Sequence, residues 1–491
     1  MSDETQALLQ RGQAALDRGR WPESAQCFGL ALQRQADNAP AWHNLGLSLF
    51  ALGRTQAAAD ACKRALNLNR DLLPTYVVLG KATKALGDAA QADACFRHVL
   101  KQSPTHAQAR VALADLCMNV FGQPLEAVEL VKPLLGDAEF GEDAELTTLM
   151  AGLYDRDVSA QDHNARLLRF SQASLQLDPA QFDFLPAGHR IGPSDLPLPS
   201  HPEWRPASGR KRPRVGLLSP LFCVSPVYFL TIAGWQRIAN GCELVVFNRG
   251  HKSDWATQVF RGLASEWVDV QEVNAEQLAA RLYGAQLDVL YDLGGWMDPI
   301  GLKALSVKPA PQMFKWVGGQ SVTTGLQSFD GWIGDAWQSP LHLQHLYTEP
   351  LVNIEGGYAT YTPPDYLPAT PKTKSDVPVI FSNPAKLSRA FLTHLQGMKG
   401  KKRFVHQQFK YAQSRAQVLK FLPECDVEFV TPSGHQEALE VLGQHRVMLD
   451  TFPYSSGLTA QEALAMGVEV KAKVGTLFCE RHCAALVKST A

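Results

Sequence analysis

A stretch near the C-terminus places hydroxyl, glycine and carboxylate residues where an apolar strand pattern changes to a helical one. The strand pattern is Val447–Leu449, and a loop containing Ser456 and Gly457 follows it. Thr459 is expected to cap a helix in which Glu462 lies one turn further along. Free N–H groups at a helix start favour an anion, and open α/β sheets bind ligands outside the carboxyl ends of their strands. The stretch therefore predicts a nucleotide site, with phosphate at Ser456, Gly457 and Thr459 and the ribose diol at Glu462; an ordinary connecting loop is the alternative.

Two further loops carry polar side chains directly after predicted strands. The strand Val377–Phe381 leads into a loop that contains Asn383 and Lys386. The strand Asp426–Val430 leads into a loop that contains His435. By themselves, these loops are typical of a solvated lysine at a helix start and of a histidine on a surface loop.

Thr323 and Thr324 lie in a third loop of this kind. The block Trp316–Leu326 that contains them predicts a strand that runs into a flexible loop. Such a loop offers hydroxyls and backbone N–H groups, which suit a phosphate or a sugar. We therefore include both threonines among the candidate ligands.

The sequence does not predict a metal site. Asp155–Asp157 has the Asp-x-Asp spacing of metal-dependent transferases, but it falls in a helical segment and does not follow a strand. Cys479 and Cys483 are four residues apart and could share a helix face with His482. A zinc site needs further ligands, and no second pair completes this one.

The elements that must hold these residues begin after a helical repeat array. Glycines recur at the tetratricopeptide period of about 34 residues, in one series at Gly12, Gly46 and Gly80 and in another at Gly19, Gly53 and Gly87. A fourth, weaker repeat begins near Ala107. Stacked helical hairpins leave a concave groove that suits an extended peptide. The array is therefore expected to bind a protein partner or substrate, and a helical spacer is the alternative.

The remaining two thirds of the chain alternate between strand and helix patterns. Predicted strands at Arg214–Ser219, Leu244–Phe247 and Val289–Tyr291 alternate with helical stretches such as Asn274–Tyr283. This alternation is typical of a parallel sheet wound by helices. The predicted order is repeats over 1–136, a helical connector and proline-rich linker over 137–212, a first α/β lobe over 213–364, a bridge over 365–376 and a second lobe over 377–491.

The stretch 449–468 resembles the signature of the bacterial relatives of protein O-linked N-acetylglucosamine transferases, roughly LDTFPYNGGTTTCEAL-x-MGVPVV. The chain keeps Asp450–Tyr454, Gly457, Thr459, Glu462–Leu464 and Met466–Val468. It departs from the signature at Ser455, Ser456, Leu458 and Ala460. Further blocks match the family in order, at 214–226, 288–296, 308–312, 316–326, 347–351, 358–364 and 475–482.

The resemblance implies a fold and an activity. The fold would be an N-terminal tetratricopeptide superhelix followed by a GT-B fold, that is, two Rossmann-like lobes (α plus α/β). The activity would be inverting transfer of a sugar, most simply N-acetylglucosamine from its UDP donor, onto Ser or Thr of a protein held by the repeat groove. Neither a metal nor another cofactor is expected, since the UDP-sugar is itself the substrate.

The resemblance also assigns roles to the candidate residues. Lys386 would be the catalytic residue, because a cation can neutralise charge on the departing diphosphate. The donor-binding residues would be Asn383, His435, Ser456, Gly457, Thr459, Glu462, Thr323 and Thr324.

Three family side chains that bind or ionise are replaced in this chain, by Leu221, Ser225 and Trp296. In the family, histidine is usual at the last two of these positions. These replacements keep two alternatives open. One is a degenerate scaffold that binds a partner without turnover. The other is an active transferase with a different donor, for example one that modifies flagellin or another surface protein.

Composition limits the other classes of function. The chain has 491 residues and a formal net charge of −1, which implies neither a nucleic-acid-binding field nor a polyacidic tail. The nine cysteines include no Cys-x-x-Cys pair, which indicates reduced thiols. The N-terminus lacks an apolar signal core, and no apolar run is long enough for a bilayer span. The expectation is a soluble cytoplasmic protein.

Overall fold

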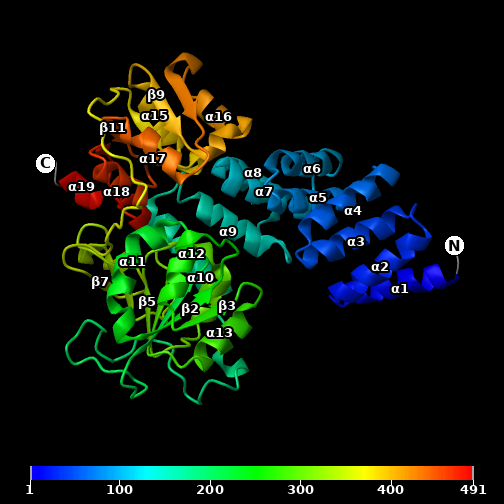
Figure 1. Cartoon of the computed structure of the whole chain (residues 1–491), viewed down its shortest axis with the longest axis horizontal. Coiled ribbons are helices and arrows are strands. Elements are labelled where there is room, and N and C mark those ends of the chain that lie inside the picture. Colours follow the sequence, from blue (N-terminus) through cyan, green and yellow to red (C-terminus); the bar gives the residue numbers. More distant parts are fainter. Residues whose placement is uncertain (1–2, 489–491) are drawn as a thin grey trace. The chain divides into compact units, whose positions relative to one another are not determined.

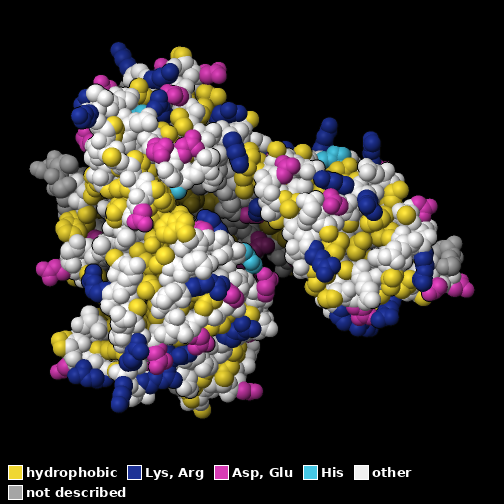
Figure 2. All heavy atoms as spheres, viewed as in Figure 1, with side chains coloured by type: hydrophobic (Ala, Val, Ile, Leu, Met, Phe, Trp, Pro, Cys, Tyr) yellow, Lys and Arg dark blue, Asp and Glu magenta, His cyan; other side chains and the backbone are white. Residues whose placement is uncertain are grey.

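The computed structural model describes residues 3–488, and the chain divides into two compact units, Met1–Ala151 and Gly152–Ala491. The boundary falls inside the segment for which the sequence predicts a helical connector. Among the described residues, no helix has the length and apolar character needed to cross a membrane. Basic and acidic side chains are mixed over the visible surface (Figure 2), in keeping with the small net charge.

The first unit is an array of helical hairpins, in which each helix packs against the next one in the chain (Figure 1). Its helices are α1 (Asp3–Asp17), α2 (Trp21–Arg34), α3 (Ala39–Ala51), α4 (Thr55–Leu68), α5 (Leu73–Ala85), α6 (Ala89–Gln102), α7 (Ala107–Leu116), α8 (Pro124–Val131) and α9 (Gly141–Ala151). The predicted repeats are therefore present as helix pairs, including the pair that begins at Ala107.

The recurring glycines of the array serve two physical purposes. Gly80 lies where α5 meets α6, and a Cβ atom there would be 2.5 Å from Phe96 Cε1. Only glycine allows this close approach without a shift of the packed ring. Gly87 has φ +84°, a left-handed conformation that glycine adopts without a Cβ penalty, so it can end α5 and start the turn to α6.

The second unit contains two lobes, each with one parallel sheet. The first lobe has a seven-stranded sheet in the order β3-β2-β1-β4-β5-β6-β7. Its strands are β1 (Arg214–Ser219), β2 (Glu243–Asn248), β3 (Glu266–Asp269), β4 (Val289–Asp292), β5 (Gln312–Lys315), β6 (Gly331–Gly334) and β7 (Leu351–Asn353). The helices of this lobe are α10 (Ala160–Ser174), α11 (Pro226–Ile238), α12 (Trp255–Leu263), α13 (Ala275–Gly284) and α14 (Pro299–Leu305).

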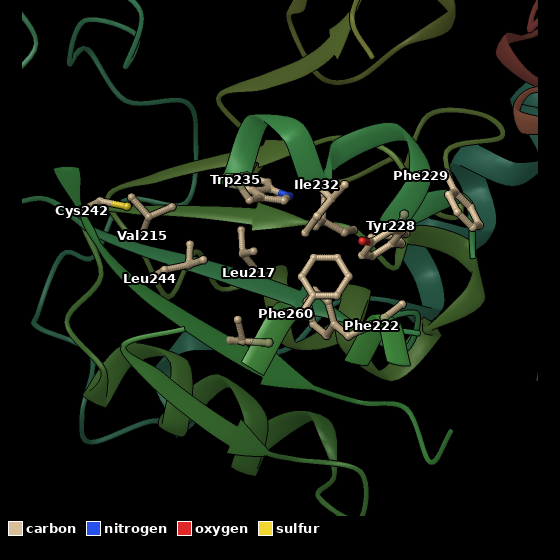
Figure 3. Close-up of a cluster of buried hydrophobic side chains, with 14 residues drawn as sticks. Val215, Leu217, Phe222, Tyr228, Phe229, Ile232, Trp235, Cys242, Leu244 and Phe260 are labelled. Atoms are coloured by element: carbon tan, nitrogen blue, oxygen red, sulfur yellow. The ribbon is translucent and has the colours of Figure 1, made fainter. Parts of the chain in front are cut away.

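A buried aromatic and aliphatic cluster fixes α11 and α12 against β1 and β2. Figure 3 shows Leu217 of β1 and Leu244 of β2 on one side and Ile232 and Trp235 of α11 on the other. Phe260 of α12 completes the contact and is fully buried. Strands buried by helices read as continuous apolar runs, as the sequence of β1 and β2 does.

The proline-rich stretch before β1 has no regular structure beyond one short turn, Pro179–Gln181. It nevertheless lies against the first lobe. Trp204 donates its indole N–H to the side chain of Gln312 at 2.7 Å, and His189 Nε2 lies 2.7 Å from the carbonyl of Val307. The stretch is therefore part of this lobe and does not separate the two compact units.

The second lobe has a five-stranded parallel sheet in the order β10-β9-β8-β11-β12. Its strands are β8 (Val379–Phe381), β9 (Lys402–Val405), β10 (Val427–Val430), β11 (Val447–Leu449) and β12 (Glu469–Lys471). Its helices are α15 (Arg389–Gln396), α16 (Ala412–Leu419), α17 (His435–Gly443), α18 (Leu458–Ala465) and α19 (Ala484–Lys488). The strand order reverses between β8 and β11, and such a switch point is where open α/β sheets bind ligands.

Candidate functional site

A cavity of about 550 Å³ lies at this switch point, between the two lobes of the second unit. The second lobe lines it with the four loops that follow β8, β9, β10 and β11. The first lobe lines it with the start of α11 and with Lys252, which follows β2. The volume is in the range typical of small-molecule sites. Six of the residues predicted from sequence line this cavity: Asn383, Lys386, His435, Ser456, Thr459 and Glu462.

Lys386 is half-buried at the wall of the cavity. Its Nζ donates to the carbonyl of Ser455 at 3.1 Å and lies 4.5 Å from the centroid of the Tyr454 ring. Burial lowers the pKa of the Lys386 ammonium, and the nearby Asp450 partly offsets this effect. The lysine is thus held by a carbonyl and an aromatic ring. Among the described residues, no carboxylate forms an ion pair with it, so its charge can act on an anion.

The loop after β11 differs in detail from the prediction. Asp450 is buried and accepts the backbone N–H of Ser456 at 3.0 Å, so this N–H is not free for a phosphate. The prediction that Thr459 caps the helix is wrong, because α18 begins at Leu458 and Gly457 is its N-cap. No side chain caps α18. Its first N–H groups are therefore left for a ligand, since the initial donors of a helix have no partner within it.

His435 and Glu462 contact each other in the cavity wall. His435 Nε2 lies 2.7 Å from Glu462 Oε1, and His435 Nδ1 lies 2.8 Å from the hydroxyl of Tyr366. Burial raises the pKa of Tyr366 to about 12, with a further contribution from Glu462, so the hydroxyl keeps its proton at neutral pH. In the neutral imidazole, Tyr366 then donates to Nδ1 and Nε2 donates to Glu462. This places a residue of the predicted bridge, Tyr366, behind the site.

His406 was not predicted from sequence, although it follows β9 directly and lines the cavity. Its Nδ1 accepts the backbone N–H of Gln408 at 3.3 Å. Burial, together with a smaller contribution from the Lys386 charge, lowers the pKa of His406 to about 4. The ring is therefore neutral at pH 7 and carries its proton on Nε2. A polar residue directly after a strand beside the switch point is the signal that would have identified it.

Asn383 lines the cavity beside Lys386, but its side-chain oxygen already accepts the backbone N–H of Ala385 at 2.9 Å. Its amide nitrogen is the group left to face a ligand. In the first lobe, Ser225 lines the cavity and donates its hydroxyl to the carbonyl of Leu221 at 2.8 Å. The side of the cavity that belongs to this lobe therefore presents a hydroxyl and the cation of Lys252, with no imidazole among its lining residues.

The structure does not bring Thr323 and Thr324 to the cavity. Both are buried, and they surround the carboxylate of Glu349, which is itself fully buried. Glu349 accepts the Thr323 hydroxyl at 2.6 Å and the Thr324 N–H at 2.7 Å. A buried carboxylate requires such donors. Their assignment as donor ligands is therefore corrected: these threonines hold Glu349 in the first lobe.

The glycine-containing turn before these threonines is pinned by a buried ion pair. Lys315 is fully buried, and its Nζ lies 3.3 Å from Asp292 and donates to the carbonyl of Gly318 at 2.7 Å. Trp296, which stands where the resembled family has histidine, is also buried and donates its indole N–H to the carbonyl of Thr323 at 3.0 Å. This end of the first lobe is thus occupied by internal contacts.

Potential metal ligands elsewhere are also paired. Asp155 and Asp157 both contact Arg389, at 2.9 and 2.8 Å. Cys483 Sγ lies 3.1 Å from a carboxylate oxygen of Asp450. Within residues 3–488, no group of three or more His, Cys, Asp or Glu side chains is arranged to hold a metal ion.

Models of the tetratricopeptide repeat match residues 9–75 and 73–106. Among curated proteins, the chain is 24% identical over 316 residues to a probable UDP-N-acetylglucosamine–peptide N-acetylglucosaminyltransferase SPINDLY of Solanum lycopersicum, covering 59% of this chain and 34% of that protein. It is 24% identical over 304 residues to the SPINDLY protein of Arabidopsis thaliana, covering 57% and 33%. The chain thus spans about a third of the length of these relatives.

A solved structure shares the fold of the whole chain. It is a mutant of the O-GlcNAc transferase of Thermobaculum terrenum, with a TM-score of 0.56, 21% sequence identity and coverage of 99% of this chain and 86% of that one. This likeness confirms the predicted fold, a repeat array followed by a GT-B pair of lobes. The chain is therefore a divergent tetratricopeptide-repeat protein that resembles the O-GlcNAc transferases.

Proposed function

We propose that the chain is a glycosyltransferase that moves a sugar from a UDP-sugar onto Ser or Thr of a protein, with N-acetylglucosamine as the simplest sugar. The observation that carries the proposal is the meeting of Lys386, His435 and Glu462 with the uncapped start of α18 around one cavity. A cation and free N–H groups suit a diphosphate, and a carboxylate suits the hydroxyls of a ribose. The names of the curated relatives support the same class of reaction.

Lys386 and α18 would act on the leaving group. As the bond between the sugar and the diphosphate breaks, negative charge develops on the diphosphate oxygens. An ammonium group and preorganised N–H donors stabilise that charge without a metal ion. Thr459 lies in the first turn of α18 and would present its N–H and hydroxyl to the same oxygens.

His435, Glu462 and His406 would hold the nucleoside part. Glu462 is 1% exposed, and its Oε1 accepts the Nε2–H of His435. The other carboxylate oxygen is then left for the ribose hydroxyls. His406 is neutral and offers an N–H from Nε2. Phe229 lines the cavity and lies 5.2 Å from the His435 ring, so the two rings form an apolar surface for a planar base.

The repeat array would select the protein acceptor, because stacked hairpins present a groove suited to extended peptides. Transfer also requires that the acceptor hydroxyl lose its proton. The cavity residues include one carboxylate, Glu462, and that group is engaged by His435. The proton acceptor is therefore not assigned to a residue.

The lack of an assigned proton acceptor among the cavity residues favours a second candidate function. This function is a scaffold that binds a nucleotide and a protein partner without turnover. Ser225 and Trp296 replace side chains that are histidines in the resembled family, and Trp296 is buried in the first lobe. A scaffold would keep the nucleotide contacts of the second lobe and lack sugar transfer.

A transfer assay separates the two candidates. The full chain is incubated with UDP-N-acetylglucosamine and proteins extracted from cells that lack this chain, and intact masses are recorded by mass spectrometry. A transferase adds the mass of one sugar per modified site and releases UDP. UDP binding without a mass increase, repeated with other UDP-sugars, would establish the scaffold instead.

A further inference from the structure

Four consecutive residues at the start of the second unit, Tyr154–Asp157, each contact the second lobe. None of them lines the cavity. Their side chains reach three different loops: the loop after β8 that carries Lys386, the loop after β11, and the segment 475–483. The proposed function leaves these contacts unexplained, and the Asp-x-Asp spacing within them has no metal-binding role among the described residues.

Tyr154 supports the ring on which Lys386 rests. The rings of Tyr154 and Tyr454 are stacked, with centroids 5.0 Å apart and an interplanar angle of 15°. The Lys386 ammonium lies 4.5 Å from the centroid of the same Tyr454 ring, and the Tyr454 hydroxyl lies 2.9 Å from the hydroxyl of Ser321. Tyr454 is thus located by Tyr154 and Ser321, and Tyr454 in turn locates the ammonium.

Asp155 and Asp157 hold the other end of the loop that carries Lys386. Asp155 accepts the backbone N–H of Arg389 at 2.8 Å and its guanidinium at 2.9 Å, and Asp157 accepts the same guanidinium at 2.8 Å. These contacts raise the pKa of Arg389. Arg389 is the first residue of α15 and lies three residues after Lys386. The backbone that presents the lysine is therefore anchored at the helix start.

Arg156 anchors the segment 475–483 through an ion pair with Glu480. The Arg156 side chain is 12% exposed and the Glu480 side chain is 4% exposed. Glu480 also accepts the backbone N–H groups of Thr476 at 2.7 Å and Leu477 at 3.1 Å. The adjacent Cys479 carbonyl accepts the N–H of Ser455 at 2.9 Å. Ser455 is the residue whose carbonyl receives Lys386 Nζ, so this chain of contacts ends at the same ammonium group.

We propose that Tyr154–Asp157 is a positioning segment that fixes the Lys386 ammonium at the cavity, with Tyr154 and Asp155 as its main contacts; for catalysis, this inference rests on the proposed function. The segment Tyr154–Asp157, between the repeat helices and the first lobe, then supports the diphosphate site by positioning Lys386. Preorganisation of a charged donor is what such a segment supplies, since a donor displaced by an ångström loses much of its effect.

The test uses the full chain with Tyr154→Ala, Tyr154→Phe and Asp155→Asn. Tyr283→Ala is the matched control, because Tyr283 also packs on one aromatic ring, Phe184, at 5.3 Å, but in the first lobe. Lysines are dimethylated with ¹³C-formaldehyde, and the Lys386 signal is assigned by its absence in Lys386→Arg. The chemical shift of this signal reports the distance of the dimethylated Lys386 from the Tyr454 ring, and its pH titration reports the charge around the amine. UDP affinity and the kcat and KM for the UDP-sugar are measured in parallel.

In the unmodified sequence, the Lys386 methyl signal is expected upfield of exposed lysines because of the Tyr454 ring current. Tyr154→Ala should move it toward the exposed position and weaken UDP binding by roughly three- to tenfold, the scale of one lost aromatic pair. Asp155→Asn should shift the Lys386 signal and weaken UDP binding in the same direction. In both variants, kcat should fall by a larger factor than KM rises. Tyr154→Phe should retain the signal and the affinity, as should Tyr283→Ala.

An unchanged Lys386 signal in Tyr154→Ala and in Asp155→Asn overturns the positioning role, even if UDP binds. Equal effects of Tyr154→Phe and Tyr154→Ala on the signal also overturn it, because ring stacking would then not be the cause. Failure of the unmodified chain to bind UDP contradicts the proposed function instead, and the Lys386 signal still decides whether this segment positions the lysine.

Discussion

His435 Nε2 lies 2.7 Å from Glu462 Oε1, so two residues that sequence analysis assigned separately to a nucleotide are bonded to each other. Glu462 therefore has two tasks, to orient the imidazole and to receive a ligand. Glu462→Ala should weaken UDP binding by roughly 1–3 kcal/mol, because both the His435 N–H and the ribose hydroxyls would lose their acceptor. Glu462→Gln should lose less, since the amide oxygen can still accept from His435.

Calorimetry with UDP measures this difference. Glu440→Ala is the control, because Glu440 is exposed on α17 of the same lobe. Equal losses for Glu462→Ala and Glu440→Ala would show that the effect does not arise from the cavity.

Lys386→Ala should chiefly lower turnover. The ammonium would stabilise charge that develops on the leaving diphosphate, so its loss should reduce kcat by about a hundred- to a thousandfold, or roughly 2.7–4 kcal/mol. Lys399→Ala removes an exposed lysine in the segment after α15 and should leave kcat unchanged. A coupled assay for released UDP measures kcat for both variants. A Lys386→Ala protein with native kcat would exclude a role for this cation in the reaction.

Gly80→Val should destabilise the repeat array, because its Cβ would fall 2.5 Å from Phe96 Cε1. Overpacking of this kind costs about 1–3 kcal/mol. Gly29→Ala in α2 is the matched control, since a Cβ there meets no atom within 4 Å. Thermal unfolding should show a lower transition for Gly80→Val only. UDP binding should persist in both variants while acceptor modification falls in Gly80→Val; loss of UDP binding would contradict separate tasks for the two units.

Buried histidines should make the second unit less stable in acid. Burial lowers the pKa of His163 to about 4, below the value of about 6.5 expected in the unfolded chain. The unfolded state therefore takes up the proton first. The stabilising contribution is complete above pH 6.5 and is lost as the pH falls toward 4. His406 is shifted in the same direction.

Urea unfolding at pH 7.5 and pH 5 checks this sign. His163→Leu should reduce the acid-induced loss of stability by roughly 2 kcal/mol. His342→Leu is the control because His342 is exposed. An identical pH dependence in the unmodified chain and His163→Leu would contradict the account.

The fold could be predicted from sequence because its signals are local and repeated. Glycine spacing marked the hairpins, and apolar runs followed by polar loops marked β1, β2, β4, β8, β10 and β11. The same rule located Glu462, since open α/β sheets bind ligands outside the carboxyl ends of their strands. The family resemblance, and not this rule, pointed to Lys386 and His435. His406 obeys this rule as well, but β9 begins with Lys402 and Arg403, so its sequence lacks the continuous apolar run that marks the other strands.

The errors concern contacts between residues distant in sequence. Thr323 and Thr324 form a hydroxyl loop after a strand, and nothing local shows whether such a loop faces a ligand or a buried carboxylate 25 residues away. Glu349 decides this, and its burial depends on the packed lobe. The contacts of Asp155 with Arg389, 234 residues further along the chain, have no local signal either.

If the cavity at the β8–β11 switch point binds a nucleoside diphosphate, calorimetric titration of the full chain with UDP should detect that binding. We expect binding at one site per chain, with affinity reduced at least about fivefold in Glu462→Ala, reduced as well in Lys386→Ala, and unchanged in Lys399→Ala and Glu440→Ala. Absence of UDP binding by the unmodified chain, or binding unaffected by both cavity substitutions, would contradict nucleotide binding at this cavity.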